Sequence, residues 1–302
     1  MKFLSKTNSG ILPKNKLVCL YGPEGVGKSY FASTTNKPLV LGTEGGTENY
    51  NITRLPKPTS WDEVIEMVEE VAREDHEYKT FVIDTLDWLE PLLFDKFTKG
   101  SKAIEDCFGG YGKWVSGVSD EWRKLMSSLN KVRSKMDVVL LAHSQVKTFN
   151  DPVNNAPYDR YELKLHSTKH SNLWKEYVDC LLFANYDVMV KKDNTAKAKA
   201  YGTGERKMFS QHRPAFDAKN RDGLPFEMDL SYSVLCEQIE LNKPEDPQML
   251  KDWISQRLSS ILDESLLETI NKTVESAGND SIKLRAILDR VIEKTTPTEE
   301  AP

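Results

Sequence analysis

Hydrophobic residues in the first half of the chain gather in short runs that are typical of buried parallel strands. These runs occupy residues 17–21, 38–42, 80–85 and 138–142. Between them, residues 61–73 and 120–135 place apolar side chains at helical spacing, and Ser60 is a candidate N-cap for the first helix. The alternation predicts an α/β fold with a mostly parallel central sheet flanked by helices.

The pattern is weaker in the middle of the chain. Residues 98–119 mix glycines with aromatic residues, which predicts a mobile surface loop, and residues 146–171 follow neither period. Residues 181–183 are expected in a strand, with residues 186–190 as its continuation or as a partner strand. Residues 191–200 are rich in lysine and predict a hairpin tip. Residues 201–223 are basic, and residues 230–239 are expected to complete the core.

Composition changes after residues 243–247, which contain two prolines. The remainder has helical spacing and more acids than bases, and its end, TTPTEEAP, has the composition of a disordered tail. We therefore expect a core at residues 1–242 and a separate helical extension at residues 243–302 that regulates or recruits other proteins.

The clearest motif is GPEGVGKS at residues 22–29, a full match to the phosphate-loop pattern G-x-x-x-x-G-K-[ST]. An apolar run precedes it and a helix-compatible segment follows it, as the motif requires. The alternative is a glycine-rich turn that fits by chance, but the pattern and both flanks would then have to agree by accident.

The spacing of the motif follows from the chemistry of phosphate binding. Glycines let backbone N–H groups approach an anion closely, Lys28 would reach the β- and γ-phosphates, and the Ser29 hydroxyl would hold magnesium. The nucleotide is expected to contact Gly22, Pro23, Glu24, Gly25, Val26, Gly27, Lys28, Ser29 and Tyr30.

Polar residues follow two other predicted strands. Asp84 ends one of them, and a carboxylate delivered at the end of a parallel strand is what a magnesium–nucleotide site requires. A surface aspartate is the alternative for Asp84 taken alone; beside a phosphate loop we expect it to reach the metal directly or through water. His143 and Gln145 follow the strand at residues 138–142 in the same way.

Charge and composition narrow the classes of function. The net charge of −5 argues weakly against a protein coated in nucleic acid, although a local basic stripe is sufficient for binding. No apolar run is long enough to span a membrane and the N-terminus lacks a secretory pattern, so we expect a cytoplasmic protein with four reduced cysteines. His166 and His170 lack a third metal ligand, and no serine lies in a G-x-S-x-G motif.

The segment at residues 146–171 carries interleaved cations and rings. These are Lys147, Phe149, Tyr158, Arg160, Tyr161, Lys164, His166, Lys169 and His170. Such a segment can hold single-stranded nucleic acid, with cations on phosphates and rings on bases. A solvated loop whose rings pack on the core fits equally well.

The phosphate loop, Glu44, Asp84 and His143 together resemble the ATPase core of RecA-like recombinases over about residues 15–240. More closely, the chain resembles short bacteriophage ATP-binding proteins that have only this core and act in single-strand annealing and recombination. The resemblance implies ATP and Mg²⁺ as cofactors, single-stranded DNA at residues 98–119 and 146–166, and active sites at the interfaces of a homo-oligomer.

The resemblance also implies roles for individual residues. Glu44 would orient or activate the attacking water, and His143, or Gln145 in its place, would sense the γ-phosphate. Lys219 and Arg221 resemble the paired basic residues that reach a neighbouring subunit's γ-phosphate. About twenty residues precede the loop, so we expect no counterpart of the N-terminal elements that link RecA filaments, and assembly by a ring or another contact.

Two further functions share the motif. A nucleotide or nucleoside kinase would need an arginine-bearing lid, for which Arg206 and Arg213 are candidates, although the long polar loops suit a polymer better than a small acceptor. A DNA-binding or annealing module with structural ATP would not need Glu44.

Overall fold

The computed structural model describes residues 14–192, 198–241, 247–258, 261 and 263–295. By their contacts these residues belong to two compact units, one ending at Leu241 and the other containing the helices that follow. Each unit is described by itself.

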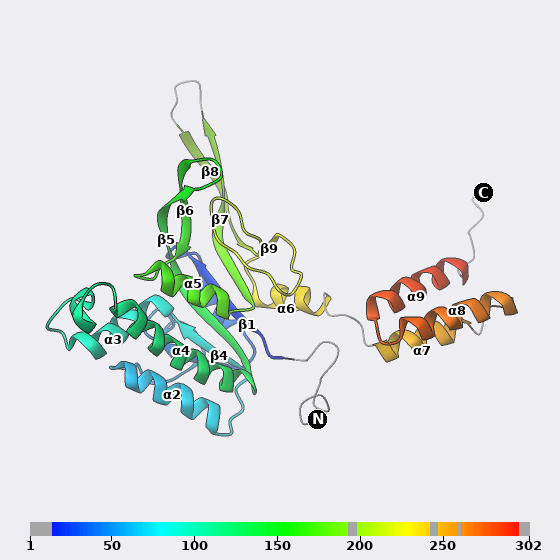
Figure 1. Ribbon diagram of the computed structural model, residues 1–302, viewed down its shortest axis with the longest axis horizontal. Coiled ribbons are helices and arrows are strands. Elements are labelled where there is room, and N and C mark those ends of the chain that lie inside the picture. Colours follow the sequence, from blue (N-terminus) through cyan, green and yellow to red (C-terminus); the bar gives the residue numbers. More distant parts are fainter. Residues whose placement is uncertain (1–13, 193–197, 242–246, 259–260, 262, 296–302) are drawn as a thin grey trace. The chain divides into compact units, whose positions relative to one another are not determined.

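The larger unit is built on one sheet, to which the described residues contribute nine strands (Figure 1). Their order is β3 (Thr53–Arg54), β2 (Pro38–Gly42), β4 (Thr80–Asp84), β5 (Asp137–Asp151), β1 (Leu17–Gly22), β7 (Cys180–Lys192), β8 (Ala198–Phe209) and β9 (Glu227–Asp229), with β6 (Ala156–Leu163) on β5. Neighbours from β3 to β7 pair in parallel, whereas β6, β8 and β9 pair antiparallel. The predicted fold class is confirmed.

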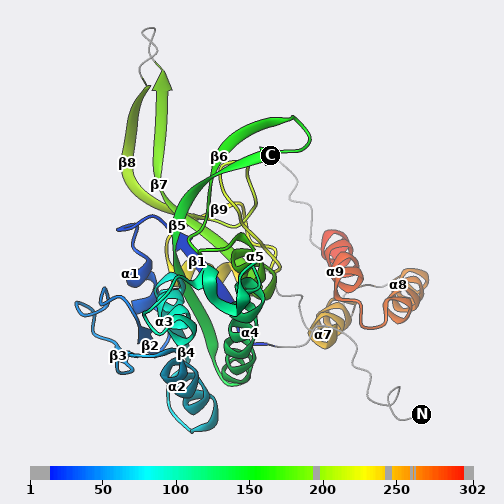
Figure 2. The same cartoon turned by 60° about the vertical axis from the view of Figure 1, so that its left-hand side comes forward.

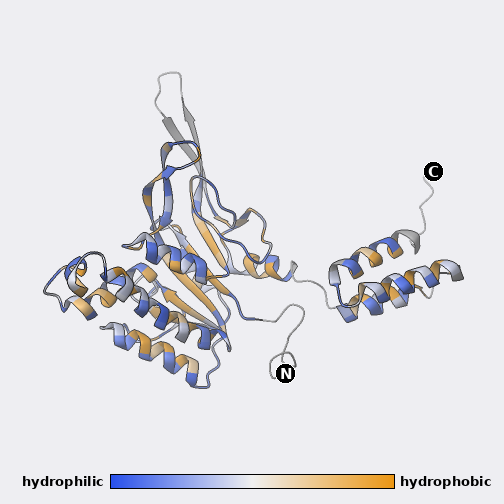
Figure 3. Ribbon diagram, in the orientation of Figure 1, coloured by the Kyte–Doolittle hydropathy of each residue, from blue (hydrophilic) through white to orange (hydrophobic). Residues whose placement is uncertain are grey.

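Helices cover both faces of the sheet (Figure 2). Successive side chains of a strand point to opposite faces, so Leu17, Cys19 and Tyr21 of β1 enter one core while Val18 and Leu20 enter the other. The first core is completed by α2 (Trp61–Arg73), α3 (Leu86–Thr98), α4 (Trp114–Arg133) and α5 (Thr168–Tyr177), the second by α1 (Lys28–Ser33) and α6 (Tyr232–Leu241). Figure 3 shows the apolar strands between these layers.

Three tryptophans tie the helices of the first layer together. Trp122 of α4 lies edge-on to Trp61 of α2 and to Trp174 of α5, with ring centroids 5.2 and 5.3 Å apart. All three are fully buried. The helix predicted at residues 61–73 is confirmed, and the Ser60 hydroxyl accepts a hydrogen bond from the Glu63 N–H at 3.3 Å, as an N-cap does.

The glycine-rich segment is more ordered than predicted. Residues Ile104–Gly109 form a 3₁₀ segment, η2, and α4 begins at Trp114, so the end of the expected loop, residues 114–119, is α-helical. Gly117 lies inside α4, where a Cβ would come 2.4 Å from the Phe108 ring. Gly117 therefore allows the Phe108 ring to pack closely against α4. From the sequence, this glycine was interpreted as a sign of flexibility.

The prediction of an irregular segment at residues 146–171 was wrong. β5 continues to Asp151 and forms a hairpin with β6, after which α5 begins. Both faces of the outer hairpin are partly exposed, so no apolar alternation reveals it. β7 is continuous through residues 186–190; the predicted tip falls partly on residues 193–197, outside the described residues. β1 ends at Gly22, which pairs with His143 of β5. β5 and β7 both continue beyond this level, so the β5–β6 and β7–β8 hairpins extend past the phosphate loop.

The smaller unit contains α7 (Pro247–Leu258), α8 (Glu264–Ala277) and α9 (Ser281–Thr295). Its own apolar core is formed by Leu250, Ile254, Leu258, Ala277, Leu284, Leu288 and Val291. The predicted helical extension is confirmed as helical, while its last residues, 296–302, are outside the described part. None of the described helices combines the length and apolar character needed to cross a membrane.

Candidate functional site

The phosphate loop lies between β1 and α1, at the centre of the sheet. Two of its glycines are required by geometry. A Cβ at Gly22 would come 2.3 Å from the carbonyl oxygen of Ala184 on β7, and Gly27 has a φ of 106°, which side chains rarely adopt. The loop can therefore fit against β7 and turn into α1 only with glycine at these positions.

Lys28 is buried at the start of α1. Its Nζ donates hydrogen bonds to the carbonyl oxygens of Gly22, at 3.1 Å, and Pro23, at 2.9 Å. Burial lowers the pKa of Lys28, and the nearby carboxylate of Asp84 opposes that shift. The ammonium therefore lies within the loop, as the motif predicts for a group that binds phosphate.

Ser29 and Asp84 meet beside the loop. The Ser29 hydroxyl donates to Asp84 Oδ2 at 2.8 Å, and Asp84 ends β4, two strands from β1. Burial raises the pKa of Asp84, while the hydrogen bond from Ser29 lowers it. Hydroxyl and carboxylate oxygens are the ligands that Mg²⁺ prefers, and magnesium in nucleotide sites takes only one or two from protein. Ser29 and Asp84 could hold that ion.

His143 lies between two carboxylates at the end of the same sheet. Its Nδ1 is 2.8 Å from Asp87 Oδ2, and its Nε2 is 3.7 Å from Glu44 Oε2. The His143 backbone N–H also donates to Asp87 Oδ1 at 2.9 Å. The contacts with Asp87 orient the His143 imidazole toward Glu44. The Glu44 carboxylate, which could accept a proton, and the His143 ring therefore face the phosphate loop together.

Asp87 was missed by the sequence analysis. It lies in the first turn of α3, three residues after Asp84. Burial opposes ionisation of this carboxyl group, but the hydrogen bonds from His143 outweigh burial and lower the pKa of Asp87. The Asp87 carboxylate therefore remains charged beside His143. The available signal was a second acid just after the strand-end acid, in the sequence Asp84-Thr85-Leu86-Asp87.

A cavity of about 410 Å³ joins these groups. It is lined by Glu24, Gly25, Gly27, Lys28, Ser29, Tyr30, Glu44, Gly46, Tyr50, Asp84, His143 and Arg206. Besides the glycines, seven of these lining residues were predicted from the sequence to belong to the site: Glu24, Lys28, Ser29, Tyr30, Glu44, Asp84 and His143. Tyr50 was not predicted at the site, and Arg206 was named only as a candidate lid arginine of the kinase alternative. The ring centroid of Tyr50 lies 6.4 Å from that of Tyr30.

Of the two residues expected to compete as γ-phosphate sensors, only His143 lines the cavity. The Gln145 side-chain amide donates instead to the carbonyl oxygens of Leu163 and Leu165, at 2.9 and 3.1 Å. Gln145 thus holds the base of the β5–β6 hairpin closed.

The base of that hairpin is also attached to α3. The backbone N–H of His143, where the chain leaves the sheet, binds Asp87. The backbone N–H of His166, where the chain returns, donates to Glu90 Oε2 at 2.8 Å. Asp87 and Glu90 are one turn apart, so one helix holds both ends of the hairpin segment.

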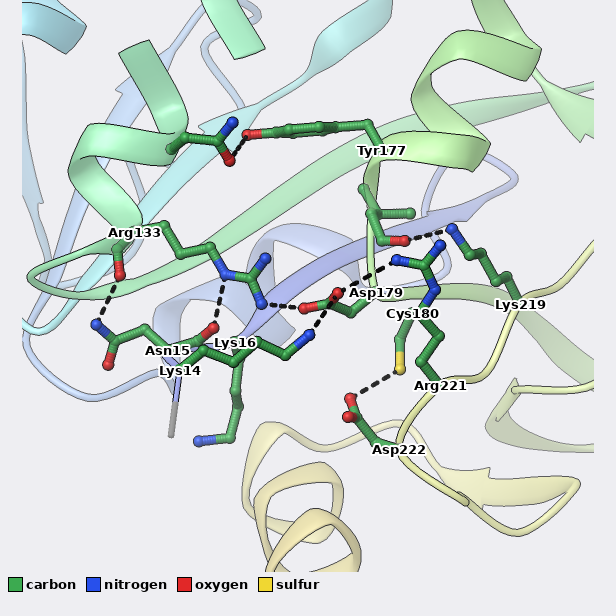
Figure 4. Close-up of polar contacts among 12 residues, drawn as sticks. Lys14, Asn15, Lys16, Arg133, Tyr177, Asp179, Cys180, Lys219, Arg221 and Asp222 are labelled. Atoms are coloured by element: carbon green, nitrogen blue, oxygen red, sulfur yellow. Dashed lines mark hydrogen bonds and ion pairs between the residues drawn. The ribbon is translucent and has the colours of Figure 1, made fainter. Parts of the chain in front are cut away.

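Lys219 and Arg221 lie elsewhere in the fold (Figure 4). Lys219 pairs with Leu181 near the start of β7, whereas the phosphate loop follows the opposite end of β1. Its Nζ donates to the carbonyl oxygens of Lys175, Glu176 and Val178 at 2.7–2.8 Å and thereby caps the C-terminus of α5.

Arg221 belongs to the cluster around Asp179, a buried carboxylate that also pairs with Lys14 and Arg133 (Figure 4). Neither Lys219 nor Arg221 lines the cavity. Within this chain they contact groups at the end of the central strands that is opposite the phosphate loop, and their contact with a neighbouring subunit's phosphate stays a prediction.

A family model described as "AAA domain" matches residues 14–222, more than half of the chain. The match contains the phosphate loop, Glu44, Asp84 and His143. A search of curated proteins found no match. Nucleotide binding at a loop of this kind, next to a strand-end carboxylate, is what this family shares, and it indicates ATP binding and hydrolysis. The chain therefore belongs to the AAA domain family of P-loop NTPases.

Proposed function

We propose that this protein is a magnesium-dependent ATPase that binds single-stranded DNA and acts in phage DNA recombination or single-strand annealing. The observation that carries the ATPase part is that the Ser29–Asp84 pair and the Glu44–His143 pair line the same cavity beside the phosphate loop. Such a site offers a place for the metal, a base for water and a polar group for the γ-phosphate.

The β5–β6 hairpin supports the DNA-binding part. Phe149 and Tyr158 form a cross-strand ring pair with centroids 5.5 Å apart, and Lys147 lies on the same hairpin. Rings beside a cation can stack on bases while the cation binds phosphate. Not every candidate in this segment is accessible, because Arg160 and His170 are buried. The candidates that are at least partly accessible are Lys147, Phe149, Tyr158, Tyr161, Lys164, His166 and Lys169.

A change in the bound nucleotide would be transmitted to the β5–β6 hairpin through His143. This residue faces the cavity, and its carbonyl oxygen accepts a hydrogen bond from the N–H of Lys164 at 2.9 Å, at the hairpin's return. A shift of His143 on binding the γ-phosphate would therefore move both strands at their base. ATP would favour DNA binding and hydrolysis would release DNA, with sites completed between subunits of a homo-oligomer and the helical extension recruiting partner proteins.

The deciding experiment measures ATP hydrolysis with and without single-stranded DNA, alongside molecular mass in solution. We expect the rate to rise with DNA and with oligomerisation, and Lys28→Ala to abolish it. Phosphate transfer to nucleoside monophosphates, with no DNA stimulation, would favour the kinase alternative. Negligible turnover together with intact annealing by Glu44→Gln would favour the module with structural ATP.

A further inference from the structure

Arg206 is held directly over the phosphate loop by the β7–β8 hairpin. It pairs across the strands with Tyr186, immediately before an irregularity in the ladder between Tyr186 and Val188. A Cβ at Gly27 would lie 2.8 Å from Arg206 Nη1, so the guanidinium is against the loop backbone. Bulges of this kind re-aim side chains beside functional sites. The side chain lines the cavity, and its strand β8 lies on the other side of β1 from β4, which ends at Asp84.

Tyr186 fixes this geometry. Its hydroxyl donates to the carbonyl oxygen of Gly25 at 2.8 Å, and its ring centroid is 5.8 Å from the Arg206 guanidinium carbon. The same tyrosine therefore contacts the loop and the arginine, and a cation above an aromatic face is attracted to it. Because Tyr186 and Arg206 belong to the same hairpin, its movement relative to the loop would break the Tyr186–Gly25 hydrogen bond and carry Arg206 away from Gly27 together.

The charge of Arg206 is uncompensated within the described part of the chain, where no carboxylate forms an ion pair with it. The next residue, Lys207, differs: its Nζ is 2.7 Å from Asp229 Oδ1. The site itself is rich in acids, since Glu24, Glu44, Asp84 and Asp87 all act on Lys28. Lys28 and Arg206 are the two cations among the cavity-lining residues. These two cations are therefore available to offset the negative charge of a triphosphate in this acidic site.

We propose that Arg206 is a catalytic residue that binds the phosphates of ATP in the same chain and stabilises the charge that develops during hydrolysis. In that step the water oxygen bonds to the γ-phosphorus while the bond to the β–γ bridging oxygen breaks. The electron pair leaves on ADP, and the water proton passes to Glu44. Arg206 donates hydrogen bonds throughout and keeps its own proton. The proposal rests on the proposed ATP hydrolysis and is independent of DNA.

The test compares Arg206→Ala with the matched control Lys207→Ala, the neighbouring cation on the same strand. Arg206→Ala is expected to lower kcat for magnesium–ATP by about 10²-fold or more, because removing one charge-stabilising donor has effects of this size. ADP affinity should change less than ATP affinity. Arg206→Lys should recover part of the rate, and Lys207→Ala should stay within about two-fold of the native rate, as expected for a surface substitution. Circular dichroism of each variant verifies folding.

Mixing two inactive variants distinguishes action within one chain from action between chains. If Arg206 serves its own site, Arg206→Ala mixed with Lys28→Ala stays inactive; recovery of activity would overturn the proposal, because it would place Arg206 in a neighbour's site. Equal rates for Arg206→Ala and the native protein would also overturn it while leaving the proposed ATPase intact. A native protein without magnesium-dependent hydrolysis would overturn both.

Discussion

Asp87 binds both the backbone and the ring of His143: Oδ1 accepts a hydrogen bond from the backbone N–H at 2.9 Å, and Oδ2 lies 2.8 Å from the ring Nδ1. A carboxylate on one side of an imidazole fixes its tautomer and leaves the other nitrogen for a reacting group. Here that nitrogen, Nε2, points toward Glu44 and the cavity.

We predict that Asp87→Asn lowers ATP turnover by about 10-fold or more, as loss of an orienting partner does, with little effect on ATP affinity. It should also destabilise the protein at pH 7 by about 1–3 kcal/mol, because charge-assisted hydrogen bonds are lost. Since His143 lowers the pKa of Asp87, this stabilisation is present above about pH 4 and is lost as pH falls through the folded pKa. Thermal denaturation against pH measures it, with exposed Asp95→Asn on the same helix as control.

Glu44→Gln should separate binding from catalysis. Glu44 lines the cavity but lies outside the phosphate loop, so loss of its carboxylate should lower the single-turnover rate by about 10²-fold or more while ATP affinity by calorimetry stays unchanged. Glu48→Gln, an exposed neighbour that does not line the cavity, is the matched control. A native single-turnover rate in Glu44→Gln would remove Glu44 from the mechanism.

Asp84→Asn tests the magnesium site. Because burial raises the pKa of Asp84, its contribution to stability is full below about pH 4 and declines as pH rises through the folded pKa. Without nucleotide or metal, the variant should therefore melt at pH 7 no lower than the native protein, with the difference shrinking in acid. Magnesium-dependent ATP affinity should fall by about 10-fold or more. An unchanged affinity in magnesium titrations would contradict this assignment.

Lys219→Ala should destabilise the protein by about 1–3 kcal/mol, since three carbonyl oxygens lose a charged donor at the end of α5. Chemical denaturation measures the difference, and Lys169→Ala, exposed in the first turn of α5, is the control. A variant of native stability that nevertheless loses ATPase activity would instead favour the predicted role at a neighbour's phosphate.

Phe149→Ala should weaken single-stranded DNA binding by about 1–3 kcal/mol per stacked base, the usual contribution of a stacking ring. Fluorescence anisotropy with a labelled oligonucleotide at fixed salt measures it. Trp253→Ala, an exposed aromatic on α7 in the other unit, is the control. Equal affinities for native protein and Phe149→Ala would exclude this hairpin as the DNA contact.

The sequence was sufficient where one local pattern determines the outcome. The phosphate loop, Asp84 and His143 each follow an apolar run, and parallel strands bring such ends together regardless of details elsewhere. Arg206 could not be placed in this way, because it reaches the loop from an antiparallel hairpin whose position depends on pairing of β7 with β1. Lys219 shows the converse: the basic segment at residues 201–223 indicates charge, but only the fold reveals the helix end that Lys219 caps.

The attachment of both ends of the β5–β6 segment to one helix has a thermodynamic consequence. A strand pair anchored at Asp87 and Glu90 has already lost most of the freedom that an untethered loop would surrender on meeting a ligand. Its affinity for a partner would therefore depend on the contacts that the aromatic rings make. A substitution at Glu90 would release one end of the hairpin and so weaken binding, although Glu90 lies far from the binding surface.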